Sequence, residues 1–261
     1  MSTILVIAQN TFRESVRDKV LYNLLIFAVL LVISSLLIGE LSLNQENLII
    51  PRMGLSVMLF FGGLISIFIG TGLVYKEIDK RTIYAMLAKP VRRSEFILGK
   101  FLGLSLTLLL NCVIMLTGIL LSFTLLNYIN DNGILIAWTI IPAGYLIYLE
   151  LLLIVAIGLL FSSFSSPTLA IIFSIILYLI GSLNQDLKLF AETIPSVTAK
   201  YIALFFYYIL PNFSNFNYIS FVSHGGKIPL TDLLAVTTYT VIYTALLLVT
   251  TITIFQKRNF K

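Results

Sequence analysis

The sequence predicts an all-α membrane protein with six transmembrane helices, and three observations support this fold class. Hydrophobic residues make up 59% of the 261 residues and charged residues only 11%, whereas soluble domains carry roughly 25% charged residues. Six apolar stretches each come close to the ~20 residues that a helix needs to cross a bilayer. These stretches are apolar on all sides, whereas the strands of a membrane barrel alternate apolar and polar residues.

The first expected element is an amphipathic helix at residues 3–19 that lies flat on the membrane surface. Its apolar residues recur at helical spacing from Ile4 to Val16, and Arg13, Glu14 and Arg17 fall between them. The alternative, a secretory signal peptide, is disfavoured because no small-residue cleavage site follows Leu37.

The transmembrane spans are expected in a single domain covering residues 1–261. We place them at about 21–38, 53–75, 101–126, 134–161, 168–183 and 230–255. A polar turn at 162–167 separates the fourth and fifth spans. Residues 201–210 are also apolar, but ten helical residues reach only ~15 Å, about half of the bilayer. We therefore expect a re-entrant or interfacial helix there, in the outer loop before the last span.

The positive charges indicate the orientation of the spans. Six spans place thirteen of the 17 Lys and Arg residues on the side that carries both termini and residues 76–100. The positive-inside rule assigns that side to the cytoplasm. The net charge of +5 does not by itself indicate nucleic-acid binding, because in a membrane protein the placement of the charges matters more than their sum.

The segment 76–100 is the most polar part of the chain. Ile83, Met86 and Leu87 share one face of a short helix, which Pro90 ends. Ser94 then has the character of an N-cap for the helix that enters the third span. The alternative is a solvated positive loop, whereas a short amphipathic helix can lie on lipid headgroups or dock in a groove of a partner.

The same segment resembles the first cytoplasmic loop of the permeases of type-2 ABC transporters, a mostly export-type family. The matching residues are Glu77, Thr82, Ala85-Met86-Leu87, Pro90-Val91-Arg92-Arg93 and Gly99-Lys100. Arg81 departs from the family, which often has glycine there. The resemblance continues in the N-terminal residues Ala8, Phe12, Arg13, Glu14 and Arg17, and in the turn residues Gly158, Ser162-Ser163 and Ser166-Pro167-Thr168.

The resemblance implies that residues 82–90 form a coupling helix that sits in a cleft of a separate ATP-binding subunit. The expected contact residues are Glu77, Arg81, Thr82, Ile83, Tyr84, Met86, Leu87, Lys89, Pro90, Arg92 and Arg93. ATP and Mg would be bound by two copies of that partner, so this chain would hold no cofactor and would not be catalytic alone. A second permease copy or homologue would complete the pore in the inner (plasma) membrane of a bacterium, in contact with membrane lipids and, in some systems, with an accessory extracytoplasmic protein.

Few other residues suggest chemistry. Glu150 is the one ionisable residue well inside a span, where a charge costs ~2.5 kcal/mol or more. It has either a role in the pathway or a structural hydrogen bond to a Tyr or Ser. His224 is either a solvated loop residue or part of a site, and Gly99-x-x-x-Gly103 permits close helix packing. Gly99-Lys100 is no phosphate loop, because Ser94 and Phe101 stand where that motif needs Gly and Ser/Thr.

Two alternatives to an ABC permease remain open. A proton-coupled secondary carrier would use Glu150 as its proton site and would need interrupted helices. A membrane-embedded enzyme would need clustered catalytic groups at membrane depth, and the sequence offers one histidine and neither a G-x-S-x-G nor an H-E-x-x-H motif. The sequence does not identify the transported substrate.

Overall fold

A computed structural model describes residues 3–41, 46–79, 92–129, 138–184, 188–189, 193 and 197–257. Every regular element in these ranges is helical, as the hydropathy pattern predicts. The elements are α1 (Thr3–Val16), α2 (Lys19–Leu41), α3 (Glu46–Asp79), α5 (Arg93–Ile129), α6 (Ile140–Ser162), α7 (Pro167–Ser182), α9 (Val197–Ile209), the 3₁₀ helix η1 (Phe213–Phe216), α10 (Ile219–Ser223) and α11 (Leu230–Lys257).

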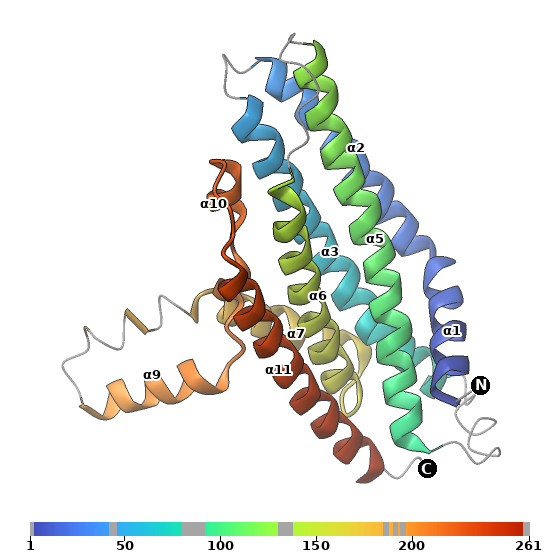
Figure 1. Ribbon diagram of the computed structural model, residues 1–261. Helices are drawn as coiled ribbons and strands as arrows, with labels where there is room; N and C mark the ends of the chain where they lie inside the picture. Colours follow the sequence, from blue (N-terminus) through green and yellow to red (C-terminus); the bar gives the residue numbers. More distant parts are fainter. Residues whose placement is uncertain are drawn as a thin grey trace.

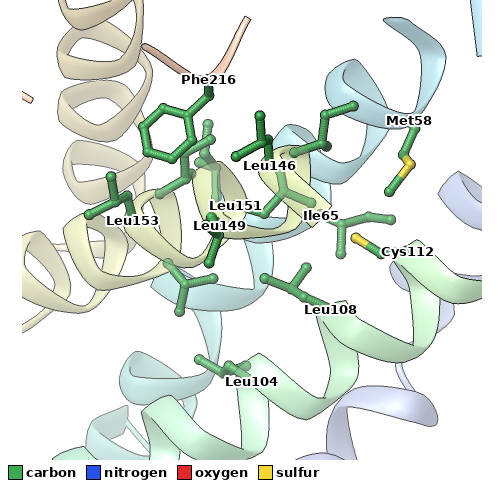
Figure 2. Packing of buried hydrophobic residues seen from close by; sticks show 14 of the residues in the cluster. Met58, Ile65, Leu104, Leu108, Cys112, Leu146, Leu149, Leu151, Leu153 and Phe216 are labelled. Carbon is green, nitrogen blue, oxygen red and sulfur yellow. The ribbon is translucent and has the colours of Figure 1, made fainter. Parts of the chain in front are cut away.

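The long helices form a bundle around α6 (Figure 1). Helix α6 is apolar around its whole circumference and is buried along nearly its whole length, as expected of a helix surrounded by others. Its leucines, such as Leu146 and Leu151, pack against Ile65 of α3 and Leu108 of α5 (Figure 2). Both termini lie at the same end of the bundle, and α10 lies toward the other (Figure 1).

Length and hydropathy qualify four of the described helices as candidate membrane spans. These are Leu48–Gly72, Arg93–Tyr128, Ile140–Ser162 and Leu230–Lys257. The other two predicted spans correspond to α2 and α7, whose apolar stretches Leu24–Ser34 and Pro167–Ser182 are shorter. The protein is therefore an all-helical membrane protein, and the total of six spans stays a prediction.

The observed helix ends refine the predicted ones. Helix α5 begins at Arg93, so the prediction of Ser94 as its N-cap is wrong. Glu95 instead accepts a hydrogen bond from the backbone N–H of Arg92 at 3.2 Å, which satisfies a free donor at the start of the helix. Helix α7 begins with Pro167 at its first position, where proline costs no hydrogen bond.

Helix α9 covers residues 201–209 of the apolar segment at 201–210. It extends sideways from the bundle (Figure 1), and the side chains of Tyr201, Phe205 and Tyr208 are exposed. The amide of Asn184 donates to the Tyr207 carbonyl at 3.2 Å and connects α9 to the segment that follows α7. Whether α9 is interfacial or re-entrant stays a prediction.

Candidate functional site

The predicted coupling helix lies outside the described residues, and so do most of its predicted contacts. The contacts outside the described part are Arg81, Thr82, Ile83, Tyr84, Met86, Leu87, Lys89 and Pro90. Glu77 lies in the last turn of α3, two residues before that helix ends. Arg92 and Arg93 lie within the described residues: Arg92 directly precedes α5, and Arg93 is its first residue.

The first turn of α5 is attached to the last turn of α11. One nitrogen of the Arg93 guanidinium donates to the carbonyl oxygens of Phe255 and Gln256, at 3.0 and 2.7 Å. Carbonyls in the last turn of a helix have no partner within it, so a cation at this position also complements the helix dipole. The rings of Phe96 and Phe255 stack with their centroids 5.8 Å apart and reinforce the same contact.

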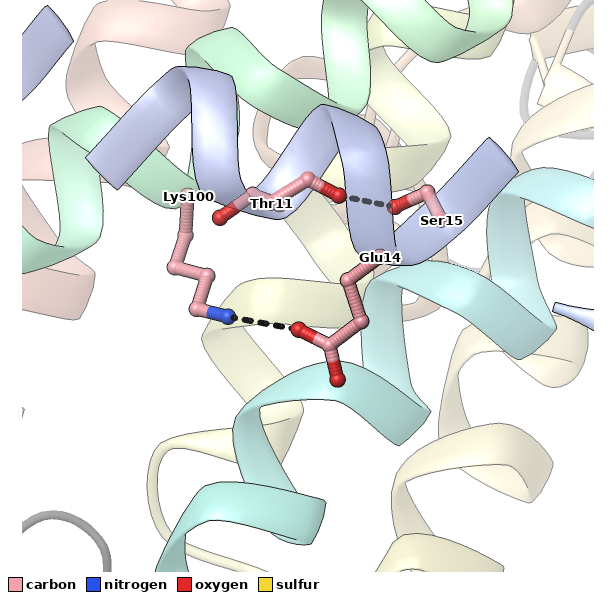
Figure 3. Close-up of polar contacts among 4 residues, drawn as sticks. All are labelled: Thr11, Glu14, Ser15 and Lys100. Carbon is pink, nitrogen blue, oxygen red and sulfur yellow. Dashed lines mark hydrogen bonds and ion pairs between the residues drawn. The ribbon is translucent and has the colours of Figure 1, made fainter. Parts of the chain in front are cut away.

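The second turn of α5 carries a buried charge that faces α1. Lys100 is only 1% exposed, and its Nζ lies 3.8 Å from a carboxylate oxygen of Glu14, which is 41% exposed (Figure 3). The same ammonium lies 5.8 Å from the centre of the Phe96 ring, a cation–π distance. The carboxylate and the ring compensate part of the cost of burying this charge.

Two glycines of α5 let α1 approach its backbone. A Cβ on Gly99 would lie 2.7 Å from the Ile7 Cβ, and a Cβ on Gly103 would lie 2.6 Å from both the Ala8 carbonyl oxygen and the Thr11 Cβ. The buried residues of α1 are the small Ala8, Thr11 and Ser15, and the side chain of Ile7 lies against Gly99. Leu5 and Val6 are exposed.

These contacts join three helix ends at the place where the chain returns from residues 80–91. We call Glu14, Arg93, Phe96, Lys100 and Phe255 the anchor cluster. A hydrogen-bonded arginine, an ion pair and an aromatic stack hold the start of α5 against α1 and the end of α11. The start of α5 is thus held by contacts to both neighbouring helices.

A comparison with known protein families identifies the family of this chain. A family model described as ABC-2 family transporter protein matches residues 5–260, nearly the whole chain. The chain belongs to the ABC-2 transporter family. It is therefore an integral membrane permease of an ABC transporter, a transport subunit of a family that generally works with an ATP-binding subunit. No curated protein matches the chain.

Glu150 is buried at the centre of this ABC-2 permease. Its side chain lies on α6 and is 3% exposed, and Tyr178 of α7 lies beside it. A role in the pathway and a structural hydrogen bond both stay predictions for Glu150. Tyr178 also lines an open cavity, so the carboxyl group is separated from that cavity by one side chain.

The segment from η1 to α10 lines polar cavities that the sequence did not reveal. One cavity of about 440 Å³ lies between η1 and the start of α11 and includes Asn217, Tyr218 and Asp232. Burial and the 3.0 Å hydrogen bond that it donates to Asp232 raise the pKa of Tyr218, which therefore stays a donor at neutral pH. His224 lies nearby, exposed, with its Nδ1 2.7 Å from the Ser220 carbonyl oxygen, so its contact is local to α10.

Sequence reasoning missed the main features of the anchor cluster. Lys100 was weighed as part of a phosphate motif, and Glu14 as a surface charge of an interfacial helix. The available signal was Gly99-x-x-x-Gly103, which places two small residues on the face of α5 that α1 covers. No sequence signal indicated that Arg93 reaches the last turn of α11, because that contact joins residues 162 and 163 positions apart.

Proposed function

We propose that this permease forms half of the translocation pathway of an ATP-driven exporter and is driven by a separate ATPase through residues 82–90. The observation that carries the proposal is the anchor cluster, which holds the chain immediately after that segment. The match to the ABC-2 family supports the permease role, and the resemblance of residues 76–100 to an export-type loop supports the coupling role and the direction.

The anchor cluster suits the transmission of a push. Arg93 joins α5 to α11, and Lys100 with Glu14 joins α5 to α1. Packed helices respond to such a displacement by moving between discrete arrangements, because close-packed interiors do not deform continuously. ATP-driven closure of the partner would therefore reach the pathway as a joint movement of α1, α5 and α11.

The proposal includes the assembly around the chain. Two ATP-binding subunits would supply ATP, Mg and all hydrolytic chemistry. A second permease copy or homologue would supply the other half of the pathway, with lipids on the exposed apolar faces and the termini in the cytoplasm. The large exposed apolar residues of α5 and α11, such as Leu121 and Val241, supply surface for lipid or for the second copy.

The coupling role is tested by charge substitutions in the predicted helix. Met86→Asp and Leu87→Asp should reduce permease-dependent ATP hydrolysis of the reconstituted complex to the rate of the ATP-binding subunit alone. Membrane insertion should be unchanged, because both residues lie outside the spans. Leu230→Asp is the matched control. Leu230 is 70% exposed and is the first residue of α11, whereas the anchor cluster contacts the last turn of that helix. Hydrolysis that stays permease-dependent in both coupling variants would refute the coupling role.

The same complex separates the exporter from a proton-coupled carrier. Glu150 is buried at 3% exposure, so no observation favours it as a proton site that exchanges with water. Transport by the reconstituted complex should stop when ATP is withdrawn and should continue when the proton gradient is collapsed. The opposite pattern would favour the carrier.

A further inference from the structure

A cavity of about 350 Å³ lies where the start of α3 meets α7 and the segment from η1 to α10. Helix α3 contributes Arg52 and Ser56, α7 contributes Tyr178, and the η1–α10 segment contributes Asn217 and Ser220. Three parts of the chain that are distant in sequence thus place polar side chains around one space. Helix α10, which contributes Ser220 to this space, lies toward the end of the bundle that is remote from the termini (Figure 1).

Four of these side chains offer hydrogen-bond donors that the described part of the chain does not use. The Arg52 guanidinium has no acidic partner there. The hydroxyl groups of Ser56 and Ser220 and the amide of Asn217 likewise have no hydrogen bond to another described residue. Among the described residues that line the first cavity, Arg52 is the one with a charged side chain; Asp232 lines the neighbouring cavity, where Tyr218 donates to it, and Glu150 lies behind Tyr178. Free donors around one guanidinium suit a phosphate or a carboxylate.

The apolar part of the lining indicates what is attached to that anion. Arg52, Ser56 and Phe60 follow each other at four-residue spacing and therefore share one face of α3. Phe60 is 63% exposed, and it lies ~12 Å along the helix from Arg52. The candidate span begins at Leu48, which places Arg52 ~6 Å into it. The stripe thus runs from a cation near the start of the candidate span to an exposed aromatic ring deeper in it.

We propose that this cavity, which we call the headgroup pocket, binds the phosphate or carboxylate of an anionic amphiphile whose apolar tail follows α3 past Phe60. Arg52 supplies the charge, and Ser56, Asn217 and Ser220 supply neutral donors. The tail replaces lipid on the exposed apolar face of α3. The proposal names a cargo class for the exporter function proposed above and rests on it.

Binding is measured first on the purified permease without any ATP-binding subunit, so that a failure of the coupling proposal does not affect the result. Native mass spectrometry in a neutral detergent compares lysophosphatidylglycerol with lysophosphatidylcholine. We expect tighter binding of the anionic lipid and a loss of about tenfold or more in Arg52→Gln, the size of one charge-assisted hydrogen bond. Arg52→Lys should retain part of the affinity. Lys227→Gln is the control, because Lys227 is an exposed cation of the same loop region outside the cavity lining.

Three outcomes would overturn the headgroup pocket. Arg52→Gln could bind the anionic lipid as well as the unchanged protein does, or Lys227→Gln could lose as much affinity. Free glycerol phosphate could also compete as well as the lysolipid, which would refute the contribution of the tail. A final arm uses the complete transporter, where the lysolipid should stimulate ATP hydrolysis in the unchanged protein and not in Arg52→Gln. Binding without stimulation, in a complex whose basal hydrolysis depends on the permease, would overturn the cargo class while leaving the coupling proposal intact.

Discussion

The contact between α1 and α5 supports a prediction that one methyl group can test. In Gly103→Ala the new Cβ would lie 2.6 Å from the Ala8 carbonyl oxygen and 2.6 Å from the Thr11 Cβ. Carbon atoms in good contact are ~3.5–4.0 Å apart, so α1 must move away by about 1 Å. Neither neighbour can rotate aside, because one is backbone and the other is the first atom of a side chain. Overpacking of this kind costs ~1–3 kcal/mol.

The matched variant is Gly63→Ala, in the middle of α3, where a Cβ would meet no atom within 4 Å. Both substitutions gain the ~1 kcal/mol by which alanine exceeds glycine in a helix. That gain cancels in the comparison, so Gly103→Ala should be less stable than Gly63→Ala by ~1–3 kcal/mol. Thermal unfolding of the purified permease in detergent should show a Tm difference of several degrees, and the amides of α1 should exchange hydrogen faster only in Gly103→Ala. Equal Tm values with equal exchange would refute the close packing of α1 on α5.

Two further predictions concern the anchor cluster. Arg93→Gln should cost ~1–2 kcal/mol through its lost charge-assisted hydrogen bonds and should raise hydrogen exchange in the last turn of α11, whereas the exposed neighbour control Arg92→Gln should leave that exchange unchanged. Glu14→Gln should destabilise by ~1–2 kcal/mol, because the buried ammonium of Lys100 loses a negative partner. Lys100→Met, which removes the buried charge and keeps the volume, should cost less in the same thermal unfolding assay, and the reverse order would refute this role of the pair.

The helical fold was predictable because each long helix has to be apolar over a length that the bilayer sets. The four predicted spans at 21–38, 53–75, 101–126 and 230–255 each fall inside one helix of the structure, and the span at 168–183 passes the end of α7 by one residue. The fourth span was predicted to begin at residue 134, but residues 138–139 form a turn and α6 begins only at Ile140. Hydropathy alone does not separate apolar residues of a connection from those of the helix that follows.

Contacts between distant helices could not be predicted, for a physical reason. A helix in lipid can be apolar on all sides, so its sequence does not mark which face meets another helix. Helix α1 shows the difficulty, because its apolar spacing predicted a face turned to the membrane surface and did not indicate that Ala8, Thr11 and Ser15 would be its buried residues. The headgroup pocket was hidden similarly, since Arg52, Tyr178 and Asn217 come from three separate segments.

Helix α11 provides the physical connection between the anchor cluster and the headgroup pocket. Its last turn receives Arg93, and its 28 residues extend ~42 Å from there. Toward its other end, the hydroxyl of Tyr239 accepts the backbone N–H of Asn212 at 2.8 Å, immediately before the η1–α10 segment that lines the pocket. Between these two contacts, buried hydroxyls such as those of Thr240 and Thr251 donate to carbonyls of α11 itself. The Tyr243 hydroxyl between them donates to the carbonyl of Ile209 at the end of α9 at 2.6 Å, so one continuous helix carries the contacts that join the anchor cluster to α9 and to the side of the pocket formed by Asn217.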